Sequence, residues 1–135
     1  MGKSLILTTN TSSAQVTPGN AVPLGNITRR FGCGYILGNN AIVITQPGYY
    51  NIDVLTTFTG TVGNVVLDVQ QNGATIPAAT ATETLSAANT QSKTITIPTT
   101  ARVYNESYSP ITVVVDTAST STPTVSAISV RIVKE

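Results

Sequence analysis

Apolar and polar residues alternate with a period of two along most of this chain. Such alternation places successive side chains on opposite faces of a β-strand. It is clearest in the stretch whose apolar positions are Tyr50, Ile52, Val54 and Phe58. It returns in four later stretches, at residues 65–69, 95–97, 111–115 and 128–132. Thr, Val and Ile dominate these stretches, and their branched side chains favour a pleated surface. The pattern predicts an all-β fold.

Gly, Pro and Asn residues separate these stretches at short intervals. Asn72-Gly73 is the strongest hairpin signal, because both residues tolerate the positive φ of a type I′ turn. Short strands joined by such turns are typical of a sandwich, jelly roll or barrel. Ala78 to Ala88 is the one candidate for a long helix, but it is broken by Thr and is predicted to be a strand followed by a loop. The Ser/Thr-rich segment Ala118 to Thr124 is predicted to be a long hairpin loop.

The length of 135 residues suits one domain, which we expect to span residues 1–135. No repeat or linker divides it, and residues 1–25 form either a first strand or a docking arm. The fold class predicted is a jelly-roll β-sandwich of two antiparallel sheets with no substantial helix. The core is expected at the inward apolar positions: Ile42, Ile44, Tyr50, Ile52, Val54, Phe58, Leu67, Ile128, Val130 and Ile132.

Charge is scarce: 10% of the residues are charged, against about 25% in ordinary soluble domains. The surface is therefore made of Thr, Ser, Asn and Gln, or much of it is buried against copies of the chain. A net charge of +1, a single basic pair (Arg29-Arg30) and no Trp argue against nucleic acid as a partner. No apolar run approaches the ~18 residues of a membrane span, and the N-terminus lacks a signal-peptide core. We expect synthesis in the cytoplasm, without membrane insertion.

Catalytic side chains are few. The chain has no His, which removes the commonest general base and metal ligand. The six acidic residues are spaced too widely for a calcium loop, and those on strands are expected to face solvent rather than to meet as a catalytic pair. Cys33, alone in an apolar stretch, is predicted to be a small buried side chain. We expect no enzymatic activity, no cofactor and no metal.

The segment Ile42 to Ile52 resembles the signature strand pair of the jelly roll shared by the complement globular head and tumour necrosis factor. In that family an alternating strand runs into Pro-Gly-x-Tyr-x-apolar, and Pro47, Gly48, Tyr50 and Ile52 occupy those places. The similarity covers roughly residues 35–135. The last strand departs from the family in being aliphatic, and Pro98-Thr99-Thr100 stands where the family has a Gly-Asp turn. The resemblance implies a trimeric assembly.

In that family the strand after Pro-Gly covers the core with one face and turns the other towards the threefold axis. The resemblance therefore implies that Tyr49, Asn51, Asp53 and Leu55 face sister subunits. The last strand should lie beside this one and place Arg131 on the same face as Asp53. We expect an ion pair between these two residues, within a chain or between subunits.

The run Asn72 to Thr84 is similar to short Ala/Thr-rich jelly-roll proteins encoded among bacteriophage and prophage virion genes. This likeness implies a homotrimeric virion protein that decorates the head, forms a head fibre or sits at the tail tip, bound to capsid or tail proteins. Exposed loops at residues 60–64, 84–92 and 119–123 would carry such contacts. The alternative is the carbohydrate- or cell-surface-binding head of a fibre, in which Tyr104 and Tyr108 contact host glycans.

Overall fold

The computed structural model describes residues 3–38, 40–87, 91–104 and 108–135. Within these ranges the chain forms strands and no helix. The strands are β1 (Ser4–Asn10), β2 (Ala14–Gln15), β3 (Asn26–Phe31), β4 (Tyr35–Gly38), β5 (Ala41–Ile44), β6 (Gly48–Gly60), β7 (Gly63–Gln71), β8 (Ala74–Leu85), β9 (Lys93–Val103), β10 (Ser109–Val115) and β11 (Pro123–Lys134).

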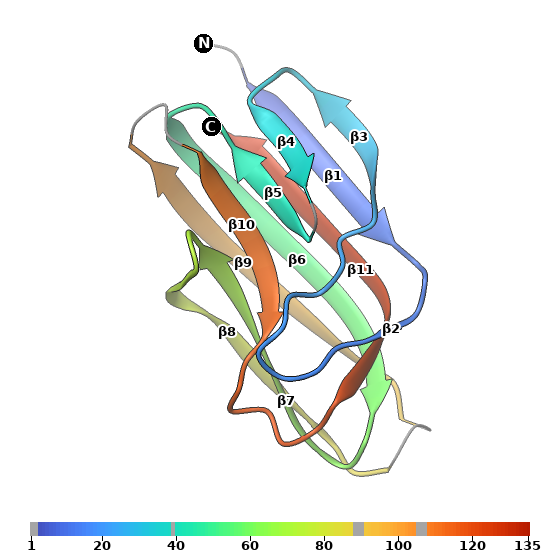
Figure 1. The fold of residues 1–135 in the computed structure, drawn as a ribbon. Coiled ribbons are helices and arrows are strands. Elements are labelled where there is room, and N and C mark those ends of the chain that lie inside the picture. Colours follow the sequence, from blue (N-terminus) through green and yellow to red (C-terminus); the bar gives the residue numbers. More distant parts are fainter. Residues whose placement is uncertain (1–2, 39, 88–90, 105–107) are drawn as a thin grey trace.

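These strands form two antiparallel sheets (Figure 1). Sheet A has the order β3-β1-β11-β6-β9, with β2 paired to one end of β11. Sheet B has the order β4-β5-β10-β7-β8. The last strand therefore lies in the middle of sheet A, between β1 and β6. The predicted jelly-roll sandwich is confirmed.

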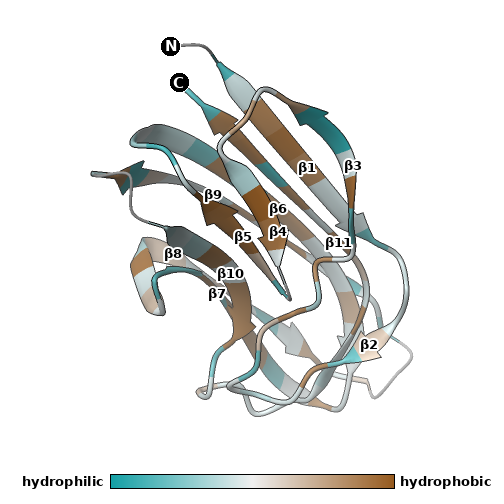
Figure 2. Ribbon diagram, turned by 45° about the horizontal axis from the view of Figure 1, so that its top comes forward, coloured by the Kyte–Doolittle hydropathy of each residue, from teal (hydrophilic) through white to brown (hydrophobic). Residues whose placement is uncertain are grey.

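The space between the sheets is filled by one cluster of apolar side chains. All ten side chains expected in the core lie there, each at most 3% exposed. Full burial of one large apolar side chain stabilises a fold by about 1.5–3 kcal/mol. Figure 2 shows the apolar stretches of β1, β5 and β10 that contribute to this cluster. The period-two pattern of the sequence thus corresponds to the inner faces of two sheets.

Residues 16–24, here called the strap, cross from sheet A to sheet B between β2 and β3. The backbone N–H of Val22 donates to the carbonyl of Val113 on β10 at 2.7 Å. Val16, Val22 and Leu24 are buried. Residues 4–10 before the strap form β1, which pairs with both β11 and β3. The N-terminal region is therefore packed into the sandwich.

The turn chemistry at Asn72-Gly73 is as predicted. Asn72 has a φ of 55° and Gly73 a φ of 81°, and they join β7 to β8 with Gln71 opposite Ala74. In the Ala78–Ala88 segment, Ala78 has a φ of 64° at an irregularity of the β7–β8 pairing, and the chain is a strand from there to Leu85; Ala88 lies outside the described ranges. The Pro98-Thr99-Thr100 segment lies inside β9 and is not a turn. Pro98 is tolerated there because β9 is an edge strand.

The prediction of a hairpin loop at residues 118–124 is wrong. This segment crosses from β10 in sheet B to β11 in sheet A. Ser119 and Ser121 are buried: Ser119 Oγ accepts from the N–H of Val66 at 2.9 Å, and Ser121 Oγ donates to the carbonyl of Thr61 at 2.6 Å. Their hydroxyls satisfy backbone groups where β6 turns into β7, so residues 119–123 are not an exposed contact loop.

The prediction that Cys33 is buried is also wrong. Cys33 lies in the turn between β3 and β4 and is exposed. Its neighbours Gly32 and Gly34 have φ values of 80° and 103°, which an extended strand does not allow. The apolar alternation around Cys33 is therefore interrupted by a turn.

Two threonine hydroxyls in the core, on Thr8 and Thr56, have no hydrogen-bond partner. Valine has the same shape without the hydroxyl, so Thr56→Val should raise the free energy of unfolding by about 1 kcal/mol. The matched control is Thr57→Val on the other face of β6, where the hydroxyl lies 3.1 Å from that of Thr94. That variant should stay within about 0.5 kcal/mol of the parent in urea denaturation. A loss of stability in Thr56→Val would contradict the assignment of an unsatisfied hydroxyl.

Candidate functional site

The outer face of sheet A, the one turned away from the core, is built of cross-strand rows. Residues directly opposite one another in neighbouring strands share a face. The central row follows from the pairings of β3, β1, β11, β6 and β9 and contains Arg29, Leu7, Arg131, Asp53 and Pro98. The row on one side contains Phe31, Leu5, Val133, Asn51 and Thr100, and the row on the other side contains Thr9, Ser129, Leu55 and Thr96.

All five residues predicted for a trimer interface lie on this outer face. Tyr49, Asp53, Leu55 and Arg131 are exposed, and Asn51 is half-buried. Arg131 Nη1 lies 3.3 Å from Asp53 Oδ2, so the ion pair forms across two strands of one chain. Both side chains are about half exposed, so the pair contributes no more than about 1 kcal/mol.

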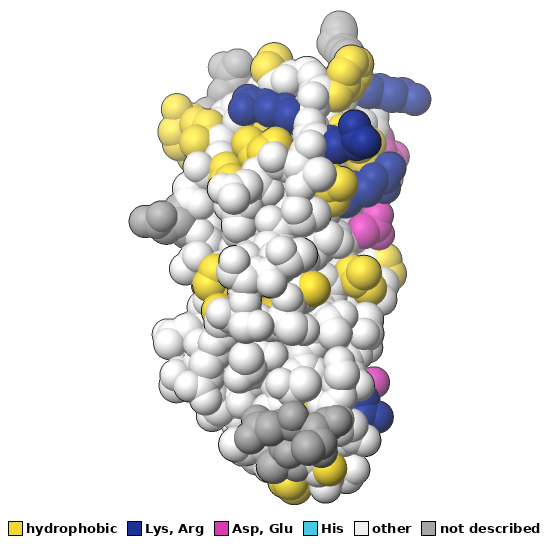
Figure 3. Space-filling view, turned by 90° about the vertical axis from the view of Figure 1, so that its right-hand side faces the viewer, with side chains coloured by type: hydrophobic (Ala, Val, Ile, Leu, Met, Phe, Trp, Pro, Cys, Tyr) yellow, Lys and Arg dark blue, Asp and Glu magenta, His cyan; other side chains and the backbone are white. Residues whose placement is uncertain are grey.

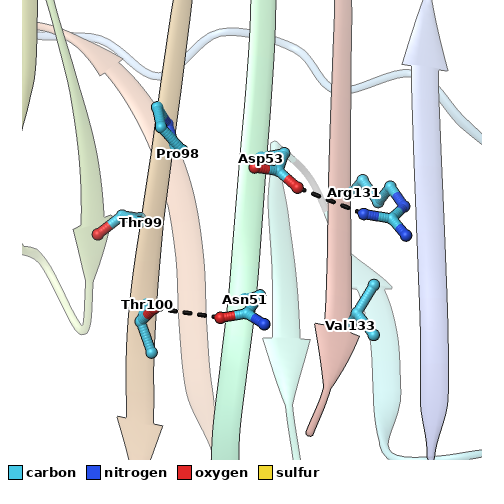
Figure 4. A pocket seen from close by; sticks show the side chains of 7 residues that line it. All are labelled: Asn51, Asp53, Pro98, Thr99, Thr100, Arg131 and Val133. Carbon is cyan, nitrogen blue, oxygen red and sulfur yellow. Dashed lines mark hydrogen bonds and ion pairs between the residues drawn. The ribbon is translucent and has the colours of Figure 1, made fainter.

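A shallow hollow of about 470 Å³ lies on the same face (Figure 4). Asn51 and Thr100 are joined in it by a hydrogen bond of 3.1 Å from the threonine hydroxyl to the amide oxygen. The Asp53–Arg131 pair forms its other side. The hollow is therefore part of the outer face and not a separate cleft.

The positive side chains are concentrated at one end of the molecule, a feature that the net charge conceals. This basic end comprises Lys3, Arg29, Arg30, Arg102, Arg131 and Lys134, which lie in sheet A at the level of Tyr49 to Asp53. Among the described residues it holds two acidic ones, Asp53 and Glu135, so its net charge is +4. Figure 3 shows most of the dark-blue side chains in the upper part of the molecule.

Arg102 at the basic end is held between two aromatic rings. Its guanidinium carbon lies 5.0 Å from the centre of the Tyr49 ring and 4.2 Å from that of Tyr104. Gln71 Nε2 donates to the Arg102 carbonyl at 3.0 Å and so joins the end of β7 in sheet B to β9 in sheet A. Stacking of this kind fixes the plane of the guanidinium.

A second hollow, of about 340 Å³, lies beside Arg102, between the β7–β8 hairpin and β9. Its lining comprises Gln71, Ala74, Thr75, Ile76, Pro77, Thr100, Ala101, Arg102 and Tyr104. Tyr104 is 71% exposed and Tyr108 is 67% exposed. Sequence reasoning named both tyrosines but missed Arg102, because its position opposite Tyr49 depends on the register of β6 and β9.

Asp68 on β7 and Asp116 after β10 form a carboxyl pair in sheet B. Asp68 is 1% exposed, and its Oδ1 accepts from the Thr80 hydroxyl at 2.8 Å. Burial raises the pKa of Asp68 to about 6, and the neighbouring carboxyl group of Asp116 adds to the rise. The Asp68 carboxyl and the N–H of Ala118, which donates to Asp116 Oδ1 at 2.8 Å, lower the pKa of Asp116. Asp68 therefore keeps its proton to a higher pH than Asp116 does.

The expectation that strand acids face solvent is wrong for Asp68. Its carboxyl group is covered, so a substrate cannot reach it, and neither hollow includes Asp68 or Asp116 in its lining. The pair has the geometry of a structural link and not of a hydrolytic site, which needs both carboxyl groups in an open cleft. In the described ranges, no group of three or more potential metal ligands comes together.

Comparison by sequence finds no family model and no curated protein that matches this chain. Comparison by structure finds the zebrafish complement 1qA globular domain, with a TM-score of 0.67 and 8% identity over 96% of this chain and 94% of that one. Eiger TNF from S. frugiperda matches with a TM-score of 0.61 and 8% identity, over 98% and 91% of the two chains. PRD1 vertex protein P5 matches with a TM-score of 0.60 and 13% identity, over 98% and 96%.

These likenesses show the fold: the chain is a jelly-roll sandwich of the same architecture as the complement head and TNF. The segment Ile42 to Ile52, on which the sequence resemblance was based, forms β5, the turn after it and the start of β6. No described segment is a helix that could cross a membrane.

Proposed function

We propose that the protein is a homotrimeric structural and binding module, a bacteriophage virion accessory whose subunits meet through the outer face of sheet A. The main support for this proposal is that the outer face of sheet A exposes large apolar side chains. Leu55 in the middle of it is 47% exposed and Tyr49 is 51% exposed, next to Leu5 and Leu7 in the neighbouring rows. A second copy of the chain is the occupant that the proposal commits to.

The charges of the outer face favour a copy of the same chain over a highly charged partner. Asp53 and Arg131 neutralise each other at its centre. The row of Leu55 consists otherwise of Thr9, Ser129 and Thr96, which carry no charge. The part of the outer face around Leu55 therefore suits self-association, because no ion there has to be desolvated without a partner. Arg29 lies in the central row but on β3, at the edge of the sheet.

The likeness to the vertex protein of the phage PRD1 supports a place in the virion. In that role the trimer is a head decoration, a head fibre or a tail-tip domain that binds capsid or tail proteins. The scarcity of catalytic groups supports a structural role: the chain has no His, and in the part that the structure describes Asp68, the member of the carboxyl pair with the raised pKa, is buried. The alternative function, a surface-binding head of a fibre, is supported by the exposure of Tyr104 and Tyr108.

Light scattering on the purified protein tests the assembly. The wild type should have three times the 14.0 kDa mass of one chain, and Leu55→Arg should give monomers because three buried guanidinium groups would lack partners. Ile36→Arg is the matched control: Ile36 is 48% exposed but lies on β4 in sheet B. It should stay trimeric. Circular dichroism should show both variants folded.

A monomeric wild type at micromolar concentration would refute the trimer. The virion role is tested separately by quantitative mass spectrometry of purified particles, where the protein should occur in a multiple of three copies. Absence from particles whose genome encodes it would refute that part and leave the trimer untouched.

A further inference from the structure

We infer that the basic end carries a binding site for an acidic polysaccharide, centred on Arg102 and Tyr104. This inference deepens the binding part of the proposed function. It does not depend on the trimer. The chemical class that the site would take is a sugar residue bearing a carboxylate, within a chain of such residues.

The guanidinium of Arg102 is preorganised to bind an anion. The rings of Tyr49 and Tyr104 hold it at 5.0 and 4.2 Å, so its plane is fixed before any ligand arrives. In the described part of the chain the one ion pair joins Arg131 to Asp53, so no carboxylate there neutralises Arg102. A planar guanidinium with free N–H groups binds a carboxylate through two parallel hydrogen bonds.

The hollow beside Arg102 has the walls that a sugar ring requires. Its volume of about 340 Å³ lies at the small end of the range for ligand sites, roughly 300–1,000 Å³. Thr75, Thr100 and Gln71 line it. Thr100 and Gln71 already donate to Asn51 Oδ1 and to the Arg102 carbonyl, so their oxygens are left to accept hydrogen bonds from sugar hydroxyls. Ile76 and Pro77 supply apolar surface for the C–H face of a ring. Tyr104 is exposed on the rim and can stack on the next sugar along the chain.

The surrounding charge favours a polymer over a single acidic sugar. Six of the seven Lys and Arg side chains lie at the basic end, which has a net charge of +4 among the described residues. Such a field raises the local concentration of a polyanion and weakens as salt is added. Nucleic acid is the competing polyanion, because the open face of Tyr104 can stack on a base as well as on a sugar, and the titration with an oligonucleotide decides between the two.

The hollow adjoins the proposed trimer interface and shares its border: Thr100 lines the hollow and belongs to the row of Asn51, and Tyr49 stacks on Arg102. The hollow opens between β8 and β9, where the edges of the two sheets approach each other, and so lies beside the outer face of sheet A. A sugar chain can therefore reach Arg102 from the side of β8 while sister subunits cover the rows around Leu55.

Isothermal titration calorimetry with three probes tests the site. The probes are a galacturonic acid oligosaccharide, its fully methyl-esterified form and a single-stranded DNA oligonucleotide of equal charge. The acidic oligosaccharide should bind, and binding should weaken as the salt rises to about 0.15 M and beyond. The esterified form has the same sugars without the carboxylates, and we expect it to bind at least about tenfold more weakly.

Substitution variants test which side chains contribute to binding. Arg102→Ala should weaken binding of the acidic oligosaccharide at least about tenfold, and Arg102→Lys should recover only part, because ammonium lacks the planar fork. Tyr104→Ala should weaken binding of the acidic oligosaccharide several-fold. The matched control is Lys93→Ala, which removes a positive charge from the opposite end of the same strand. It should change affinity less than about twofold.

Equal binding of the acidic and esterified probes, equal effects of Arg102→Ala and Lys93→Ala, or no binding of the acidic oligosaccharide at millimolar concentration would each overturn the inference. Tighter binding of the oligonucleotide would overturn it in favour of nucleic acid. Light scattering on the same samples separates the two proposals: binding by a monomer refutes the trimer alone, and a trimer that binds no acidic probe refutes this site alone.

Discussion

Replacing Gly25 by alanine should destabilise the fold more than any other single methyl group added to a turn. Gly25 directly follows the strap and has a φ of +79°, where an L-residue is strained by about 1–2 kcal/mol. A Cβ atom there would also lie 2.9 Å from the Cα of Asn10 and would overlap the carbonyl oxygen of Thr9. Both neighbours are backbone atoms of the β1 end, so they cannot rotate away. Overpacking adds about 1–3 kcal/mol to the strain.

Gly73→Ala provides the matched control. Gly73 has a φ of +81°, nearly that of Gly25, but no atom lies within 4 Å of a Cβ placed there. The Gly73→Ala variant should therefore lose only the stability that the backbone strain costs, about 1–2 kcal/mol. Urea denaturation of the two variants measures the difference. Equal losses would show that the strap moves away from β1 without cost and that its packing contributes little to stability.

The Asp68–Asp116 pair should make the protein less stable as the pH rises. The pKa of Asp68 is raised from 3.8 to about 6 in the folded state, so the folded protein holds more protons than the unfolded chain between these values. Stability due to Asp68 is therefore fully present below about pH 4 and is lost as the pH rises through about 6. The loss is on the order of 2–3 kcal/mol. The lowered pKa of Asp116 acts in the opposite sense, below its ordinary value.

Asp68→Asn tests this dependence. Asparagine is neutral at every pH and has nearly the same shape as the protonated acid. The variant should match the wild type near pH 4 and be more stable by on the order of 2 kcal/mol near pH 7.5. Asp53→Asn, which removes an exposed charge on sheet A, is the control for loss of a carboxylate. A difference in unfolding free energy between wild type and Asp68→Asn that stays constant from pH 4 to 7.5 would contradict the raised pKa of Asp68.

The part of the fold that depends on strand periodicity could be predicted from the sequence. Along β6, buried residues such as Tyr50, Ile52 and Val54 alternate with exposed or half-buried ones. A strand with one face in the core must show this alternation, because successive side chains point to opposite faces. Connections between sheets could not be predicted. The segment at residues 118–124 contains the same Ser and Thr residues as a solvated loop, and its two buried hydroxyls are apparent only once β7 lies beside it.

The candidate site was predictable only where the family resemblance implies which strands are neighbours. Asp53 and Arg131 were placed together because the family resemblance sets the last strand beside β6. Arg102 was not, since its stacking depends on Tyr49 from β6 and on Tyr104 beyond the end of β9. Asp68 looked like any strand acid, and its burial depends on β8 and on the segment after β10. Each of these omissions involves a contact between distant parts of the chain.

The central position of β11 in sheet A has a consequence for how the chain folds. Ser4 pairs with Lys134, so the first strand meets its long-range partner only after the last strand has left the ribosome. Until then, β3 with β1 and β6 with β9 can form only as separate two-stranded ribbons, each with both edges unpaired. Topologies of such high contact order fold slowly, and open edges invite aggregation. In the cell, the newly made chain should therefore pass through an aggregation-prone stage that ends when β11 inserts between the two ribbons.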